Sequence, residues 1–169
     1  MSDVNLVRPA VASDVDGIAA VHVQGWRETY GSILPAAALA GLDVQAYADR
    51  WSQIIEAGAT GVWVATAGDD IVGWASSSTG RDEVRPHDLE LEGIYVLASH
   101  HGSGAGQQLL DAAVGGLGAY LWMAAANRRA QSFYRRNGFV PDGVEHVRTL
   151  LGTPVDVIRL TRGGDERHA

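Results

Sequence analysis

The sequence predicts an α+β fold, an α/β/α sandwich in which helices cover both faces of one sheet. Apolar residues recur at helical spacing in four segments and alternate, or run continuously, in seven shorter ones. The two kinds of segment are interleaved along the chain, as in sheets covered by helices. The 169 residues match the length of one domain. We expect this domain to span residues 1–162 and to be followed by a disordered tail over residues 163–169.

The first third of the chain predicts one strand and two helical stretches. Residues 4–8 form the strand. Ser13 is predicted as the N-cap of a helix that runs to Tyr30, because acidic residues follow it in the first turn. A second helical stretch over residues 36–56 is interrupted around Gly41.

The rest of the chain alternates between strands and helices. Two strands over residues 62–66 and 71–78 are joined by a Gly-Asp-Asp turn, which predicts a hairpin. The remaining predicted elements are strands over 89–96 and 119–124, helices over 105–117 and 127–137, and a closing strand pair over 143–150 and 155–161.

The composition excludes several classes of function. A net charge of −7 argues against binding nucleic acid through bulk charge and is compatible with a cationic substrate. The absence of cysteine excludes disulfides, thiolate metal sites and cysteine nucleophiles, and the six histidines show no metal-ligand spacing, so no metal is expected. We expect no membrane association and a cytoplasmic location, because neither a signal peptide nor an apolar run long enough to cross a bilayer is present.

The most informative segment is a glycine-rich turn between a strand and a helix. Glycines 102, 104 and 106 follow the strand that ends near Val96. Unpaired amides in the first turn of the next helix can bind an anion such as a pyrophosphate. Alternatively, the glycines only permit a tight connection. Gln107 stands where a P-loop requires lysine, and no carboxylate follows at the position that a dinucleotide-binding fold requires.

Two motifs in the right order make the sequence resemble the GNAT superfamily of acetyl-CoA-dependent N-acetyltransferases. Residues 127–139, NRRAQSFYRRNGF, match the family's Asn-x-x-Ala-x-x-Phe-Tyr-x-x-x-Gly-Phe pattern completely. Residues 101–106, HGSGAG, match its Gln/Arg-x-x-Gly-x-Gly/Ala pattern except that His101 replaces Gln or Arg. A second departure is Ala98, where proline is common. The resemblance covers nearly the whole chain.

The resemblance implies a fold and a cofactor site. It implies a mixed, mostly antiparallel sheet of six or seven strands, flanked by about four helices. The central strands 89–97 and 119–124 are expected to splay apart, with the pantetheine arm of acetyl-CoA between them. The residues implied to bind acetyl-CoA are the backbone of Ile94, Tyr95 and Val96, the pyrophosphate cradle of His101, Gly102, Ser103, Gly104, Ala105, Gly106 and Gln107, and the side chains of Asn127 and Tyr134.

Acetyl transfer to an amine requires a proton for the departing thiolate and a neutral amine. The family motif implies Tyr134 as the acid, and its usual pKa near 10 keeps it protonated at neutral pH; a merely packed aromatic ring is the alternative. Glu90 and Glu92 are candidate bases, because residues two apart on a strand share a face. Both are alternatively ordinary solvated strand residues, and the role of base is alternatively unfilled.

Trp26 and Tyr30 are candidates for an aromatic wall that binds a cationic acceptor; alternatively they belong to the core. The leading hypothesis is an acetyltransferase that moves the acetyl group of acetyl-CoA to a primary amine of a small cationic metabolite or drug-like molecule. The reaction is expected to be a direct attack in a ternary complex. Alternative functions are acetylation of a protein N-terminus or lysine, and a non-catalytic acyl-CoA sensor. A homodimer is a further expectation from the resemblance.

Overall fold

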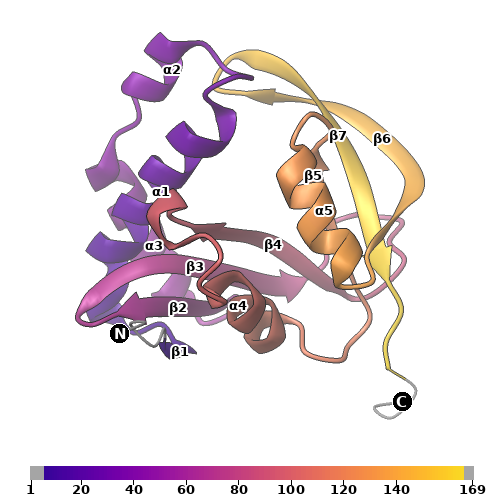
Figure 1. Ribbon diagram of the computed structural model, residues 1–169, viewed down its shortest axis with the longest axis horizontal. Helices are drawn as coiled ribbons and strands as arrows, with labels where there is room; N and C mark the ends of the chain where they lie inside the picture. The colour runs from indigo at the N-terminus through magenta and orange to yellow at the C-terminus, as the bar shows by residue number, and fades with distance from the viewer. Residues whose placement is uncertain (1–5, 166–169) are drawn as a thin grey trace.

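The computed structural model describes residues 6–165, and these form one seven-stranded sheet with helices on both faces (Figure 1). The strand order is β1-β2-β3-β4-β5-β7-β6, and every neighbouring pair is antiparallel except the parallel pair β4 and β5. The predicted α+β sandwich with a mostly antiparallel sheet is therefore confirmed. The strands are β1 (Leu6–Pro9), β2 (Gly61–Ala67), β3 (Asp70–Thr79), β4 (Leu89–Val96), β5 (Ala119–Ala124), β6 (Val140–Leu150) and β7 (Thr153–Arg162).

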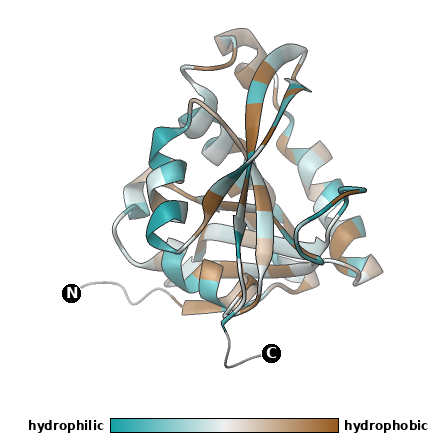
Figure 2. Ribbon diagram, turned by 90° about the vertical axis from the view of Figure 1, so that its right-hand side faces the viewer, coloured by the Kyte–Doolittle hydropathy of each residue, from teal (hydrophilic) through white to brown (hydrophobic). Residues whose placement is uncertain are grey.

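Each face of the sheet packs against a hydrophobic cluster. On one face Ile18 and Trp51 pack with Trp74, and on the other Leu109 and Phe139 belong to a cluster with side chains of β3, β4 and β5. In Figure 2 the β6–β7 hairpin lies in front and shows hydrophobic and hydrophilic residues in alternation along its strands. The helices are α1 (Val15–Tyr30), α2 (Ala36–Ala40), α3 (Val44–Ala57), α4 (Ala105–Ala113) and α5 (Arg128–Arg136), with short 3₁₀ turns η1 (Ala12–Asp14) and η2 (Ala98–His100).

The start of α1 differs from the prediction that Ser13 is its N-cap. Helix α1 begins after the turn η1, and the side chain of Asp14 organises this junction. Its carboxylate accepts hydrogen bonds from the Val11 amide at 2.8 Å and from both terminal nitrogens of Arg8 at 2.7 and 2.9 Å. An ion pair to the first strand therefore replaces a local cap.

The predicted second helical stretch is two helices. Asp43 caps α3 by accepting hydrogen bonds from the amides of Gln45 and Ala46, so a new helix starts where the sequence shows an interruption. Gly58 ends α3 with φ of +70°, a left-handed conformation that favours glycine.

The central strands β4 and β5 splay apart after two residue pairs, which confirms the expected geometry. Their register comprises only Leu89 with Ala119 and Glu90 with Tyr120. Beyond Glu90, the edge of β4 that faces β5 has no strand partner within residues 6–165. Strand β4 also carries a bulge at Glu92, because Leu91 pairs with Ser77 while Gly93 pairs with Ser76, two residues on β4 against one on β3.

Two boundaries shift by three residues or more from their predicted positions. Helix α4 ends at Ala113, four residues early, and the glycines of the following turn continue to β5. Strand β6 begins at Val140 because a register irregularity between Pro141 and Glu145 accommodates Gly143 within the strand. The Asp165 amide donates to the Gly116 carbonyl at 2.8 Å; the remaining residues of the expected tail and the start of the expected first strand lie outside the described residues.

No helix within the described range is long and apolar enough to cross a membrane.

Candidate active site

A cavity of about 1000 Å³ occupies the opening between the splayed strands. We call it the cleft. It is lined by the end of α1, the part of β4 from Glu92 onward, the glycine turn, β5 and α5. The splay is the direct cause of the cleft, because the diverging strands leave backbone edges that do not pair with each other.

The glycine turn presents main-chain donors to one end of the cleft. Gly102 and Gly104 have φ of +79° and +89°, conformations that exclude most side chains. Within residues 6–165, no acceptor is recorded for the amides of Gly102, Gly104, Gly106 and Gln107, which lie in or just before the first turn of α4. These four predicted residues line the cleft. Their geometry fits an anion held by amides and by the positive end of a helix.

Two members of the predicted cradle lie differently. Ala105 is only 1% exposed and packs into the core beneath the turn, so its side chain faces away from the cleft. The Ser103 hydroxyl accepts a hydrogen bond from the Ala105 amide at 3.3 Å, and Ser103 does not line the cleft. His101 does line it, but its Nε2 bonds the Val96 carbonyl at 2.9 Å. The side chain of His101 is therefore hydrogen-bonded to the last residue of β4, and this bond occupies one of its two ring nitrogens.

The predicted strand residues Ile94, Tyr95 and Val96 all line the cleft. The bulge at Glu92 changes which face each of them uses. Ile94 and Val96 pack with the cluster beneath α4, whereas Tyr95 packs with the cluster beneath α1. Their backbone lies on the β4 edge that β5 has left, so an extended ligand could pair there like an added strand.

Three tyrosines from three elements meet in the cleft: Tyr30 from α1, Tyr95 from β4 and Tyr134 from α5. Burial raises the pKa of both Tyr30 and Tyr95, and each of these phenols influences the pKa of the other. Gly25 permits this arrangement, because a Cβ there would lie 3.1 Å from Cδ1 of Tyr95. Burial, and then the proximity of Tyr30, raise the pKa of Tyr134 well above its usual 10.0. Tyr134 is therefore a protonated phenol throughout the neutral range.

Asn127 lines the cleft as the N-cap of α5. Its Oδ1 accepts a hydrogen bond from the Ala130 amide at 3.1 Å. The Nδ2 group of this side chain can donate a hydrogen bond to a ligand in the cleft.

The two candidate bases have different environments. Glu92 lines the cleft, and its Oε1 accepts a short hydrogen bond from the Ser78 hydroxyl. Glu90 is 2% exposed and does not line the cleft. Arg81 donates to its two carboxylate oxygens from Nη2 at 2.8 Å, Nε at 3.1 Å and its amide at 3.0 Å. The expectation that Glu90 acts as a base is therefore corrected, since it anchors the segment between β3 and β4.

Glu90→Gln is expected to lower the free energy of unfolding by about 2 kcal/mol at neutral pH, because it weakens charged hydrogen bonds to a buried group. Burial alone raises the pKa of Glu90, but the hydrogen bonds from Arg81 outweigh it and hold the pKa below its usual 4.5. The charge therefore stabilises the fold above pH 4.5, and this contribution is lost as the pH falls through the lowered pKa.

Urea unfolding at neutral and acidic pH measures this effect. The difference in the free energy of unfolding between the wild type and Glu90→Gln should narrow at acidic pH, where both side chains are uncharged. Glu83→Gln changes an exposed carboxylate in the same segment and serves as the control. A destabilisation by Glu90→Gln that is equally large at acidic pH would contradict the assignment.

The two aromatic candidates for the acceptor wall also differ. Tyr30 lines the cleft, whereas Trp26 does not. The Trp26 ring packs against the Tyr30 ring with centroids 4.6 Å apart, and it also packs with the hydrophobic cluster around Tyr30. The expectation that Trp26 contacts the acceptor is corrected, because its ring supports Tyr30 from the core side.

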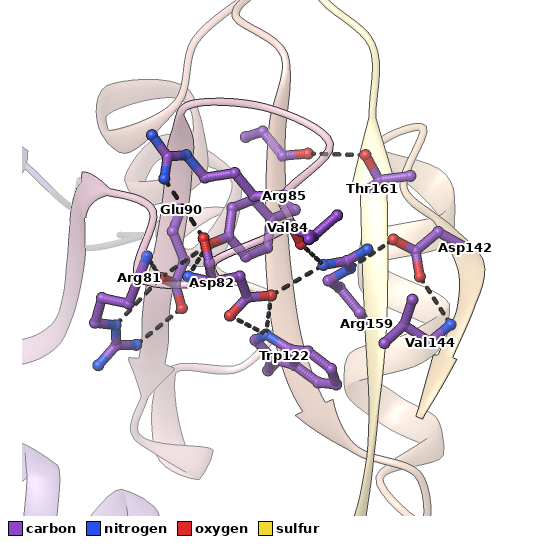
Figure 3. A network of polar contacts seen from close by, with 12 residues as sticks. Arg81, Asp82, Val84, Arg85, Glu90, Trp122, Asp142, Val144, Arg159 and Thr161 are labelled. Atoms are coloured by element: carbon purple, nitrogen blue, oxygen red, sulfur yellow. Dashed lines mark hydrogen bonds and ion pairs between the residues drawn. The ribbon is translucent and has the colours of Figure 1, made fainter. Parts of the chain in front are cut away.

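A polar network fixes one aromatic ring of the cleft that the sequence reasoning missed (Figure 3). Trp122 on β5 lines the cleft, and its indole N–H donates to both carboxylate oxygens of Asp82 at 3.0 and 3.2 Å. Arg159 pairs with Asp82 at 3.0 Å and with Asp142 at 2.6 Å. Arg159 thus bridges the carboxylates of Asp82 and Asp142, and Asp82 holds Trp122 in one orientation.

Comparison with known proteins agrees with this geometry. A family model described as an acetyltransferase (GNAT) domain matches residues 58–141, which include β4, the glycine turn and α5. The uncharacterised N-acetyltransferase YuaI of Bacillus subtilis is 37% identical over 105 residues, 62% of this chain and 59% of that protein. A probable N-acetyltransferase of Mycobacterium tuberculosis is 26% identical over 94% of this chain and 90% of its own length. The chain belongs to the GNAT superfamily of N-acetyltransferases.

Solved GNAT structures share the fold. A GCN5-related N-acetyltransferase structure from Rhodopseudomonas palustris has a TM-score of 0.70 at 20% identity, covering 96% of this chain and 98% of that one. The PaiA N-acetyltransferase of Thermoplasma acidophilum, solved in complex with coenzyme A, has a TM-score of 0.68 at 17% identity, covering 94% and 98%.

Further residues line this GNAT cleft. Glu28 lines it and accepts a hydrogen bond from the Ala98 amide at 2.8 Å, joining α1 to the turn after β4. Arg128, Arg129 and Arg136 of α5 also line it and contribute positive charge. Within residues 6–165, no group of three or more His, Asp or Glu side chains could hold a metal.

Proposed function

We propose that the protein transfers the acetyl group of acetyl-CoA to a primary amine of a small molecule, by direct attack in a ternary complex. One observation carries the proposal: a single cleft is lined by residues of the glycine turn, by Tyr134 and by Glu92. The Thermoplasma relative of the same fold was solved with coenzyme A, which supports acetyl-CoA as the donor.

The residues present fit coenzyme A. The amides of Gly102, Gly104, Gly106 and Gln107 would hold the pyrophosphate. Arg128 and Arg129 would add positive charge near the phosphates. The open edge of β4 would pair with the extended pantetheine arm, with Asn127 Nδ2 as a further donor.

The side chains divide the proton transfers between them. Acetyl-CoA, when bound, supplies the acetyl group and a thiolate leaving group. Glu92 would take the proton of the attacking ammonium, directly or through one water, so that the amine becomes a nucleophile. A backbone N–H of β4 near Tyr95 would polarise the thioester carbonyl. Tyr134 would donate its phenolic proton to the departing sulfur.

Release of free thiol from acetyl-CoA over a panel of amines tests the function. Small primary amines are expected to be accepted, and the product is expected to carry the acetyl group on nitrogen. Turnover of peptide N-termini or lysine side chains alone would indicate a protein acceptor. Binding of acetyl-CoA without thiol release from any acceptor would indicate a sensor and contradict the proposal.

Glu92→Gln is expected to lower kcat/KM for the amine by about 10²-fold, because the glutamine cannot accept a proton. The loss should be smaller at alkaline pH, where more of the free amine is already neutral. Steady-state kinetics across pH measures both effects. Glu56→Gln alters an exposed carboxylate on α3 and should leave the kinetics unchanged. An unchanged kcat/KM in Glu92→Gln would remove Glu92 as the base.

A further inference from the structure

A cation beside the cleft has no role in the proposed chemistry. Arg148 does not itself line the cleft but lies over Trp122, which does. Arg148 of β6 is exposed, and its Cζ lies 4.8 Å from the centroid of the Trp122 ring. None of the ion pairs recorded between residues 6 and 165 includes Arg148. The neighbouring Arg159, in contrast, is neutralised by Asp82 and Asp142.

Arg148 lies over the Trp122 ring, on which His146 also stacks with centroids 4.9 Å apart. No hydrogen bond of the Arg148 side chain is recorded within residues 6–165. A guanidinium that packs through its flat face keeps its N–H donors in the plane, where they match the two oxygens of a carboxylate. The Trp122 ring is itself fixed by Asp82, so it provides a rigid support. The stacked guanidinium therefore loses less conformational freedom on binding than a freely moving arginine does.

Arg148 and Glu92 lie on the same face of the sheet, on opposite sides of the opening between β4 and β5. Glu90 pairs with Tyr120 where β4 and β5 begin to splay, so Glu92 and Trp122 follow on opposite sides of the opening, and both line the cleft. Strand β6 brings Arg148 onto the Trp122 ring from the side away from β4. The acceptor end is therefore lined by a carboxylate on the β4 side, and an exposed guanidinium lies next to it, beyond β5.

We propose that the acceptor is an amino acid or a similar zwitterion, whose carboxylate binds Arg148 while its amine lies near Glu92. This inference rests on the proposed function and deepens it. It replaces the expectation of a purely cationic amine by an acceptor with charges of both signs. Arg148 and Trp122 thereby become specificity-determining residues for the acceptor.

The experiment compares amino acids with their carboxamides, which have nearly the same size but no negative charge. The probes are α-amino acids and a series of ω-amino acids of increasing chain length, each with its carboxamide. Calorimetry measures Kd with the protein alone and with coenzyme A present, and thiol release measures kcat/KM. The variants are Arg148→Gln, Arg148→Lys, and the control Arg50→Gln, which removes an exposed charge on α3.

The wild type should bind at least one acid about tenfold more tightly than its carboxamide, as expected for a hydrogen-bonded charge pair. Arg148→Gln should abolish this difference and leave carboxamide binding unchanged. Arg148→Lys should restore it in part, because lysine keeps the charge without the planar donors. Arg50→Gln should behave as the wild type.

Two results would overturn the inference. One is equal binding of acids and carboxamides by the wild type. The other is an equal weakening of both classes by Arg148→Gln. Turnover of uncharged amines together with either result would leave the acetyltransferase proposal intact, so the two proposals fail separately. Preferential acid binding that depends on Arg148, without thiol release, would support the subsite and contradict the acetyltransferase proposal.

Discussion

Tyr134→Phe is expected to lower kcat by about 10²-fold or more while the Kd of acetyl-CoA changes less than about twofold. The substitution removes only the phenolic oxygen, and the ring keeps its contacts with Phe133 and Phe139, whose centroids lie 5.3 and 5.8 Å away. The departing thiolate would then take its proton from water. Steady-state kinetics and calorimetry with acetyl-CoA measure the two quantities.

The pH dependence of kcat gives an independent check on Tyr134. An acid has to be protonated to act, and burial together with Tyr30 raises the pKa of Tyr134 above 10.0. The wild type should therefore show no fall in kcat as the pH rises toward 10.0. Tyr47→Phe, on α3 beside His22, is the control and should retain full kcat. A Tyr134→Phe enzyme with wild-type kcat would show that the hydroxyl is not the acid.

Gly104→Asp is expected to weaken coenzyme A binding by about 10²-fold or more. Gly104 has φ of +89°, so any side chain strains the backbone by about 1–3 kcal/mol. The aspartate also brings a negative charge to the end of α4, where the unpaired amides would otherwise hold a phosphate. Calorimetry with coenzyme A measures the loss.

The matched control for this variant is Gly104→Asn. Asparagine is nearly the same size, tolerates a left-handed backbone better than most residues and carries no charge. It should weaken binding less than aspartate does, and the difference between the two variants should shrink at high salt because screening reduces charge repulsion. Normal coenzyme A affinity in Gly104→Asp would contradict the proposed cradle, provided that circular dichroism shows the variant folded.

Local patterns in the sequence were sufficient to predict the α+β class, and the two motifs shared with the GNAT superfamily indicated one wall of the cleft. Alternation and helical spacing report on which face of an element is buried, and the segment that ends at Gly106 carries its own backbone requirements. Helical spacing likewise placed Asn127 at the start of a helix, where the structure makes it the N-cap. These features depend on a few neighbouring residues and are therefore visible without tertiary structure.

The acceptor end could not be predicted, because it depends on contacts between distant segments. Glu90 and Glu92 look equivalent in the sequence, yet Glu90 forms an ion pair with Arg81, whereas Glu92 accepts a hydrogen bond from Ser78. The bulge at Glu92 adds a residue that alternation alone does not reveal. Strand pairing likewise places Arg148 on Trp122 across 26 positions of sequence, a relation that no local pattern encodes.

The short register between β4 and β5 has a consequence for how the molecule behaves between reaction cycles. Only the pairs Leu89–Ala119 and Glu90–Tyr120 join these two strands, so β4 and β5 are paired at one end and unpaired along the rest of their length. A ligand that lies along the open edge completes the missing ladder of hydrogen bonds. Ligand binding and folding stability are therefore coupled, and the protein should resist heat and proteases best while the ligand is bound.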